Sequence, residues 1–102
     1  MQIFFIDQDL ENYLFSLEKP TISKIIKLID LLEIYGEKLG MPHSKYISKN
    51  IYELRIRGQQ EIRIFYCFHN NQAIFVHAFI KKSQKTPPKE IKTAQIRISM
   101  LT

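Results

Sequence analysis

The spacing of apolar residues changes from helical to alternating near the middle of the sequence. Between residues 21 and 39, apolar side chains recur every three or four positions. They fall in two neighbouring rows, at Ile22, Ile25, Ile26, Ile29 and Leu32 and at Leu28, Leu31, Tyr35 and Leu39. This spacing predicts a long helix with a wide apolar face. Because that face has to be buried, the helix needs an apolar partner elsewhere in the fold.

In the second half of the chain the apolar period becomes two. Residues 52–57, 62–69 and 74–81 alternate between two kinds of side chain, which predicts three strands. Short turn sequences at 58–60 and 70–71 separate them. Strands joined by such short turns pair antiparallel in chain order. We therefore expect the long helix to cover one face of this sheet.

The first residues of the chain predict a strand followed by a short helix. Residues 2–6 are rich in β-formers and end at Asp7. Asp7 or Asp9 can cap a helix that ends at Ser16 or Leu17. This pair of elements precedes the long helix.

The ends of the remaining elements follow from local signals. Gly40 stands at the usual stop position of a helix, and residues 45–49 can add an edge strand. Thr86 can cap a last helix with Pro87 at its first position. The predicted fold is α+β, with an N-terminal strand and two helices packed on a three- or four-stranded antiparallel sheet and a C-terminal helix. At 102 residues, the chain 1–102 is expected to form a single domain.

Several classes of protein are excluded by composition. Cys67 is the only cysteine, so the chain can form neither an internal disulfide nor a cysteine-based zinc site. The three histidines lack the spacing of metal ligands, and no cofactor motif is present. The N-terminus does not resemble a signal peptide, and no run of eighteen apolar residues occurs. We expect a cytoplasmic protein without metal or cofactor.

Charge is divided unevenly along the chain. Residues 1–40 carry three more acids than bases, whereas residues 41–102 carry eight more bases than acids, for a net charge of +5. A basic half of this kind favours a polyanion partner, nucleic acid first. A solvated basic surface without a partner fits the charge equally well.

The strand alternation sorts side chains into two faces of the sheet. One is a core face, made by Tyr52, Leu54, Ile56, Ile62, Ile64, Tyr66, Phe68, Ile74, Val76, Ala78 and Ile80. The other mixes cations with aromatic rings, at Glu53, Arg55, Arg57, Arg63, Phe65, Cys67, His69, Phe75, His77, Phe79 and Lys81. Guanidinium groups bind phosphate and rings stack on unpaired bases, so this face predicts RNA binding. The alternative is that the terminal helix covers the phenylalanines.

RNA can be cleaved by its own 2′-hydroxyl group without a metal. The reaction needs a base, an acid and cations that stabilise the crowded phosphorane. The cations are available from Arg55, Arg57, Arg63, Lys81, Lys82 and Lys85. The base could be His77, His69 or a lysine whose pKa is lowered by neighbouring cations. His43, in a loop, is a weaker candidate, and Cys67 is interpreted as a packing residue.

Five short motifs occur in an order that resembles a known family. They are LGMP at 39–42, IYELRIR at 51–57, RIFY at 63–66, HAFIKK at 77–82 and QKTP at 84–87. A helix with Glu90, Ala94 and Arg97 follows them. Together they resemble the phage-derived HigB-like branch of the RelE/ParE toxin superfamily. The resemblance implies the toxin of a type II toxin–antitoxin pair, which cuts mRNA on the translating ribosome and is neutralised by a helix-turn-helix antitoxin.

The resemblance also implies roles for individual residues. Arg55 and Arg63 would contact the scissile phosphate, and Lys82, with Lys81 as the alternative, would act as acid/base or charge donor. Further RNA contacts would come from the cations and the histidine nearby, at Arg57, His77, Lys85, Lys45 and Lys49. Some relatives carry a catalytic tyrosine or histidine near the C-terminus. Residues 83–88 contain neither, so the general base stays unassigned.

Two other functions stay open from the sequence. The same superfamily contains toxins directed at gyrase, which bind a protein and cleave no RNA. A non-catalytic nucleic-acid-binding module would also carry a basic sheet. In either toxin class, we expect the antitoxin to cover the basic sheet or the helix pair with acidic residues or an apolar helix.

Overall fold

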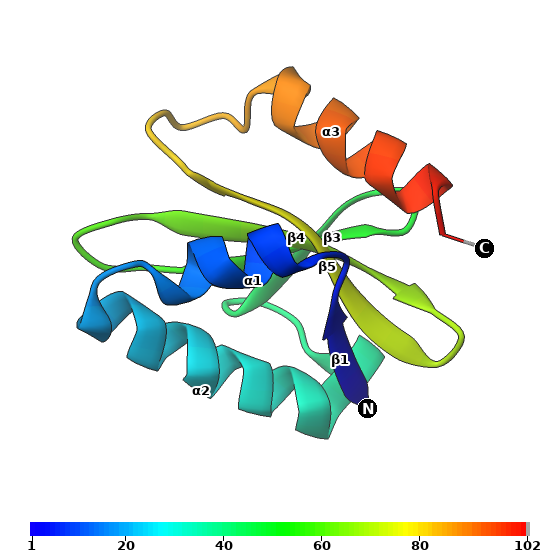
Figure 1. The fold of residues 1–102 in the computed structure, drawn as a ribbon, viewed down its shortest axis with the longest axis horizontal. Helices are drawn as coiled ribbons and strands as arrows, with labels where there is room; N and C mark the ends of the chain where they lie inside the picture. The colour runs from blue at the N-terminus through cyan, green and yellow to red at the C-terminus, as the bar shows by residue number, and fades with distance from the viewer. Residues whose placement is uncertain (102) are drawn as a thin grey trace.

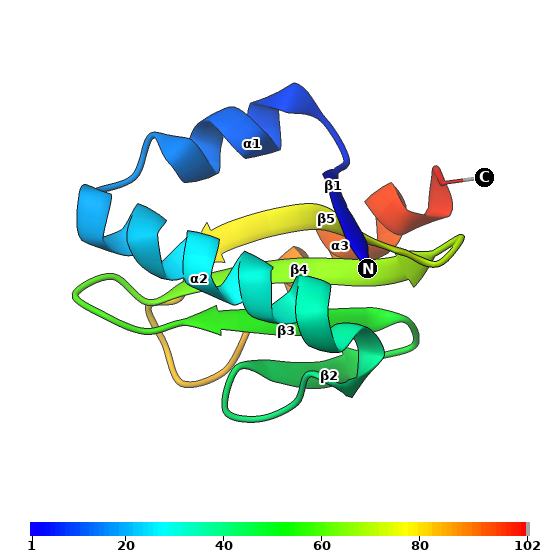
Figure 2. The same ribbon diagram turned by 90° about the horizontal axis from the view of Figure 1, so that it is seen from below.

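The computed structural model describes residues 1–101 as a curved sheet with helices on both faces (Figure 1). The elements follow in the order β1 (Gln2–Phe5), α1 (Gln8–Phe15), α2 (Lys19–Tyr35), the 3-10 turn η1 (Gly36–Lys38), β2 (Ser44–Ser48), β3 (Ile51–Ile56), β4 (Ile62–His69), β5 (Gln72–Ile80) and α3 (Pro88–Ser99). Helices α1 and α2 cover one face of the sheet, and α3 lies on the opposite face (Figures 1 and 2). The predicted α+β class is confirmed.

The sheet differs from the predicted one in its size and in one pairing. Its strand order is β1-β5-β4-β3-β2, so it has five strands. β2 to β5 pair antiparallel as expected, but β1 pairs parallel to β5, with Gln2 opposite Gln72 and Phe5 opposite Phe75. The sheet is therefore mixed rather than purely antiparallel. No turn sequence connects β1 to β5, because about 70 residues separate the partners, so periodicity could not reveal this pairing.

Local chemistry explains where the helices begin and end. Asp7 Oδ1 accepts a hydrogen bond from Leu10 N at 2.8 Å and caps α1. Pro20 lies in the first turn of α2, where no intrahelical N–H is required. Gly36, with φ +53°, ends α2 four residues before the predicted residue 39. A side chain there would be strained by that φ, and its Cβ would lie 3.3 Å from Met1 Cε.

The first core lies between the helix pair and the sheet. Its most buried members come from α1, α2, β3 and β4, namely Leu14, Ile25, Leu32, Leu54, Ile64 and Tyr66. This is the apolar partner that the helical periodicity required. It fixes β3 and β4 side by side over α2.

The second core lies beneath α3 and overturns the prediction of an open aromatic face. Phe65 and Phe79 are 0% and 6% exposed and pack with Cys67 and Ala94 of α3. These rings cannot stack on RNA bases, and the alternative in which the terminal helix covers them is correct. The basic part of this face is what α3 leaves uncovered.

A β-bulge in β5 changes which side chains face α3. Phe65 pairs with His77 and Tyr66 pairs with Phe75, so Val76 is an extra residue. Ile74 and Val76 consequently pack in the second core, whereas Phe75 packs with the first. The strict alternation predicted for β5 was wrong at these three positions, because one inserted residue reverses the faces.

Candidate functional site

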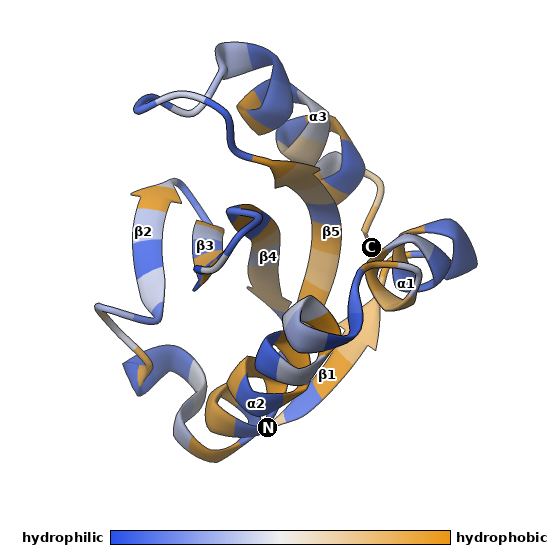
Figure 3. Ribbon diagram, turned by 90° about the vertical axis from the view of Figure 1, so that its left-hand side faces the viewer, coloured by the Kyte–Doolittle hydropathy of each residue, from blue (hydrophilic) through white to orange (hydrophobic). Residues whose placement is uncertain are grey.

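The uncovered end of the sheet forms an open, strongly basic cleft. Its volume is about 440 Å³, and it is lined by Arg55, Arg57, Glu61, Arg63, Lys81, Lys82, Ser83 and Gln84. Arg55 and Arg63 are direct cross-strand partners on β3 and β4, and the lysines follow the end of β5. The segment from β5 to α3 is hydrophilic along its length (Figure 3). Five cationic side chains thus meet a single carboxylate in the cleft lining.

A buried carboxylate holds the two central arginines in place. Glu53 is 2% exposed, and its Oε1 lies 3.5 Å from Arg63 Nε and 3.7 Å from Arg55 Nε. Its other oxygen, Oε2, accepts a hydrogen bond from Thr86 Oγ1 at 3.3 Å. Glu53 does not line the cleft. It therefore acts as a positioning residue that fixes both guanidinium groups from behind.

Glu53 was missed as a site residue by the sequence reasoning. The sequence feature that could have identified it is its spacing from Arg55. The two residues lie two positions apart on the same strand, so their side chains are on the same face of the sheet. Register supplies the rest, since Arg63 faces Arg55 across the β3–β4 pair. That register becomes visible only once the hairpin is built.

Arg63 is almost fully buried, although it lines the cleft. It is 3% exposed, and its Nη1 donates to Glu61 Oε2 at 3.1 Å and to the Ile62 carbonyl at 3.2 Å. Arg55 is more accessible, with 14% of its side chain exposed. The Nε atoms of both arginines make no hydrogen bond within the described residues 1–101. Fixed guanidinium groups of this kind are suited to bind an anion without a large loss of side-chain entropy.

The backbone around the cleft is tied down by two contacts. Lys81 N donates to the Glu61 carbonyl at 2.7 Å, which extends the β4–β5 pairing to the start of the lysine segment. Lys24 of α2 donates from Nζ to the Arg57 carbonyl at 2.6 Å. Lys82 is exposed, whereas Lys81 is half-buried. Of the two lysines, Lys82 is the more accessible to a bound substrate.

The remaining predicted RNA-binding lysines lie outside the cleft lining. Lys45 is exposed and is the cross-strand partner of Glu53, on the same face as the arginines. Lys85 lies in the loop before α3, where its carbonyl accepts from Ser83 Oγ at 2.8 Å. Lys49 lies in the β2–β3 turn, at the opposite end of β3 from Arg57. The structure therefore does not bring Lys49 to the cleft.

His77 connects β5 to α3 and does not line the cleft. Its Nε2 lies 2.9 Å from Glu90 Oε1, and its Nδ1 lies 3.5 Å from Arg97 Nη1. Arg97 can only donate, so Nδ1 accepts, and the proton on Nε2 is donated to Glu90. Both ring nitrogens thus have a polar partner on α3. His69, at the far end of β4, and His43, whose carbonyl accepts from Arg55 N at 2.9 Å, are not cleft-lining side chains either.

Residues 1–101 give little support for a metal site, a membrane-spanning helix or a cysteine nucleophile. Across residues 1–101, no group of three or more histidine, cysteine or acidic side chains is placed to hold a metal ion. Within the same residues, no helix has the length and apolarity needed to cross a membrane. Burial raises the pKa of Cys67 to about 11, so its thiol is protonated at neutral pH and is a poor nucleophile.

Comparison with known proteins gives a family match over most of the chain. Residues 12–99 match the family described as "Phage derived protein Gp49-like (DUF891)". No curated protein matches the sequence.

The fold is similar to that of the YoeB toxin in two solved toxin–antitoxin structures from Staphylococcus aureus. In the crystal structure of the heterotetrameric YoeB–YefM complex, the similarity covers 74% of this chain and 90% of that chain, with a TM-score of 0.55. In a second YoeB–YefM complex, it covers 81% and 97%, with a TM-score of 0.58. Sequence identity is 18% in both comparisons, so the similarity shows a shared fold.

Proposed function

Because the chain belongs to the phage-derived Gp49-like family, a RelE-like toxin family, we propose that it is the toxin of a type II toxin–antitoxin pair. The family match and the fold confirm the resemblance to the RelE/ParE superfamily that its motifs indicated. As its activity we propose cleavage of mRNA on the translating ribosome, which inhibits translation in the cytoplasm.

The single observation that carries this proposal is the charge of the cleft. Five cations surround a space of about 440 Å³ that is open to solvent, with Arg55 and Arg63 held side by side by Glu53. When a 2′-hydroxyl attacks the adjacent phosphate, negative charge builds on the non-bridging oxygens. Fixed guanidinium groups stabilise that charge in the transition state and need no metal.

We assign roles within the cleft from the family resemblance, and we use exposure only to choose between the two lysines. Arg55 and Arg63 contact the scissile phosphate and stabilise the phosphorane. Lys82, with Lys81 as the alternative, donates a proton to the leaving 5′-oxygen or supplies charge to it. His77 and Glu53 do not line the cleft, so neither is assigned as the base that takes the 2′-hydroxyl proton.

The composition of the cleft supports dependence on the ribosome. Its lining holds no aromatic side chain, and Phe65 and Phe79 lie buried under α3. Cations alone hold the RNA backbone but do not unstack or position bases. A translating ribosome presents mRNA already extended, and it could supply the positioning that this cleft lacks.

We propose that the antitoxin neutralises the toxin by covering the basic cleft. Acidic residues, or an apolar helix with an acidic rim, would complement the lining cations and exclude mRNA. A helix-turn-helix antitoxin would carry such a segment beside its DNA-binding domain.

Primer extension on a defined mRNA tests the proposed activity. The mRNA is translated in a purified system with and without the protein, and an untranslated sample is treated in parallel. New 5′ ends in the translated sample alone are the expected result. Cuts in both samples would show a free ribonuclease. Intact mRNA in both would refute cleavage and favour a gyrase-directed toxin or a non-catalytic binding module.

A further inference from the structure

A second pocket adjoins the basic cleft on the other side of Lys82. It has a volume of about 500 Å³ and lies between α1, the end of β5 and the start of α3, lined by Tyr13, His77, Ala78, Phe79, Ile80, Lys82, Ser83, Pro87, Lys89 and Glu90. Lys82 and Ser83 line both spaces, so the cleft and the pocket adjoin each other at the end of β5. A strand whose phosphate is held in the cleft can therefore extend into the pocket.

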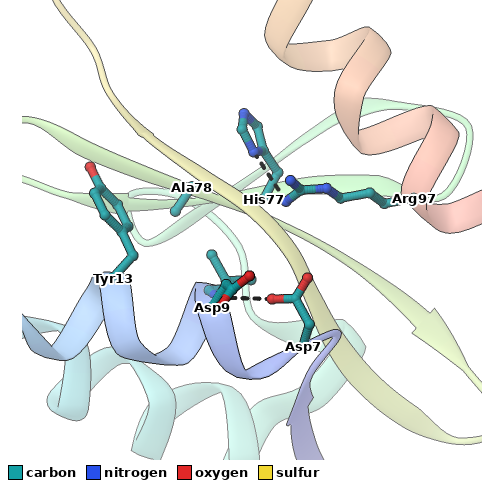
Figure 4. Close-up of a pocket in the computed structure, with 7 residues that line it drawn as sticks. Asp7, Asp9, Tyr13, His77, Ala78 and Arg97 are labelled. Atoms are coloured by element: carbon teal, nitrogen blue, oxygen red, sulfur yellow. Dashed lines mark hydrogen bonds between the residues drawn. The ribbon is translucent and has the colours of Figure 1, made fainter.

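The side chains of this pocket fit one nucleotide. Lys82 stands at the entrance from the cleft, and Lys89 lies in the first turn of α3. Tyr13 stands up from α1 beside Ala78 of β5, and it is 37% exposed (Figure 4). An exposed aromatic ring in a pocket that also holds two ammonium groups offers a base a stacking surface and its phosphates two counter-charges.

We propose that this pocket is a nucleotide subsite for the RNA next to the scissile phosphate. The base of that nucleotide stacks on the Tyr13 ring, and its flanking phosphate lies between Lys82 and Lys89. The inference rests on the proposed function, because it takes the strand in the cleft to be RNA. It adds a specific positioning contact that the cleft lining itself does not offer.

Charge limits the subsite to about one nucleotide. A smaller pocket of about 230 Å³ lies next to this one and shares Tyr13, His77 and Ala78 with it. Its lining also includes Asp7 and Asp9 at the start of α1. Figure 4 shows Asp7 and Asp9 below β5 and Arg97 extending from α3 toward His77. A second phosphate here would face two carboxylates and only one arginine. The RNA backbone is expected to leave the protein at this point.

Burial and the nearby Glu90 carboxylate raise the pKa of Tyr13 above its ordinary value. The ring therefore stays neutral across the physiological range, and its face is not weakened as a stacking surface by ionisation. Tyr13 of α1 and Glu90 of α3 both line the pocket, so its walls come from the two helices on either side of the end of β5.

The test compares variants of the pocket at one mapped cleavage site in the purified translation system. Tyr13→Ala should lower kcat/KM at least about fivefold, as expected for loss of one base–aromatic stack, and Tyr13→Phe should restore it. Lys89→Gln should lower kcat/KM and reduce the dependence of cleavage on salt concentration. Tyr35→Ala on α2 and Lys92→Gln on the same helix as Lys89 are the matched controls, and both should cleave like the wild type.

An abasic nucleotide distinguishes stacking from a change in folding. The abasic nucleotide is placed in turn on each side of the mapped bond. At the position that occupies the pocket, it should lower the cleavage rate of the wild type and leave the already reduced rate of Tyr13→Ala unchanged. Thermal unfolding of Tyr13→Ala at the wild-type temperature would show that its fold is intact.

The possible failures of the two proposals can be told apart. If the wild type cleaves and Tyr13→Ala and Lys89→Gln cleave equally well, the subsite is refuted and the proposed function stands. If Tyr13→Ala weakens only antitoxin binding, the pocket is a protein-docking site and the subsite is again refuted. If the wild type cleaves no RNA, the proposed function fails and the subsite fails with it.

Discussion

At the scale of single residues, the arginines of the cleft depend on a carboxylate that substrate does not reach. Glu53 is almost fully buried, and both of its arginine partners come from neighbouring positions on β3 and β4. A buried charge that loses its partner is strongly destabilising, whereas an exposed pair contributes little. Glu61, with 39% of its side chain exposed, provides the comparison within the same site.

We expect Glu53→Gln to lower the free energy of unfolding by about 3 kcal/mol, because it leaves Arg63 buried beside a neutral amide. The exposed Glu61→Gln should change it by less than about 1 kcal/mol. Urea unfolding followed by circular dichroism measures both. Equal effects of the two substitutions would contradict the positioning role given to Glu53.

Lys82 and Lys81 differ in exposure, and this predicts which one acts on the leaving group. Lys82→Met should reduce the cleavage rate in the translation system by about 100-fold, the usual contribution of a general acid. Lys81→Met should reduce it by less, since the Lys81 side chain is half-buried at the cleft wall. The opposite order of effects would transfer the role to Lys81.

The buried Cys67 thiol makes stability depend on pH at the alkaline end. Its pKa rises from 9.0 to about 11 on folding, so the folded state holds the proton more tightly than the unfolded state. This contribution is complete below pH 9 and is lost as pH rises from 9 toward 11, by roughly 2–3 kcal/mol. Cys67→Ala should lose less stability over that interval than the wild type. Denaturant unfolding at pH 8 and pH 10.5 gives the comparison, and parallel losses in both proteins would rule the thiol out as the cause.

At the scale of elements, the sequence predicted what local signals determine and failed where distant segments meet. The helices and strands followed from periodicity, and Asp7 and Pro20 set helix starts through their own chemistry. The end of α2 was predicted at residue 39 before Gly40, but it lies at Tyr35 before Gly36. The parallel partner of β1 depends on residues far away in the chain. The bulge at Val76 adds one residue to β5, and nothing in the alternation of side chains along that strand marks the insertion.

The same distinction holds within the candidate site. Arg55, Arg57 and Arg63 meet because a short hairpin fixes their register, and the lysine pair at 81–82 directly follows the next strand. His77 was predicted as a candidate base and an RNA contact, because the sequence does not show where α3 lies. Once α3 packs over β5, Glu90 and Arg97 engage its ring.

Arg97 anchors α3 at the bulge. Its Nη1 donates to the Val76 carbonyl at 2.8 Å. We expect Arg97→Met to destabilise the fold by about 1–2 kcal/mol and to speed amide hydrogen exchange in α3 more than in α2. Lys92→Met, on the exposed side of the same helix, should do neither. Uniform acceleration across the protein would indicate a global effect instead of a local anchor.

At the scale of the whole molecule, the positive charge is concentrated at one end of one sheet face. The acidic half of the sequence forms β1, α1 and α2, whereas the cleft lies on the opposite face, where α3 ends its cover. A polyanion approaching this surface is therefore attracted to the cleft more strongly than to the helix pair. The contribution of a lysine or arginine to mRNA cleavage should therefore depend on its position relative to the cleft more than on its charge alone.

Arg57 and Lys49 test this directly, because both are exposed and they lie at opposite ends of β3. Arg57→Gln removes a cation from the cleft lining, so it should lower kcat/KM for mRNA cleavage several-fold and reduce the salt dependence by about one counterion. Lys49→Gln removes the same net charge outside the cleft and should leave cleavage within about twofold of the wild type. Cleavage assays over a series of salt concentrations separate the two variants. If both variants lose activity to the same extent, net charge steers the RNA and the cleft does not define its path. If only Arg57→Gln loses activity, the RNA passes through the cleft between the arginines and the lysine segment.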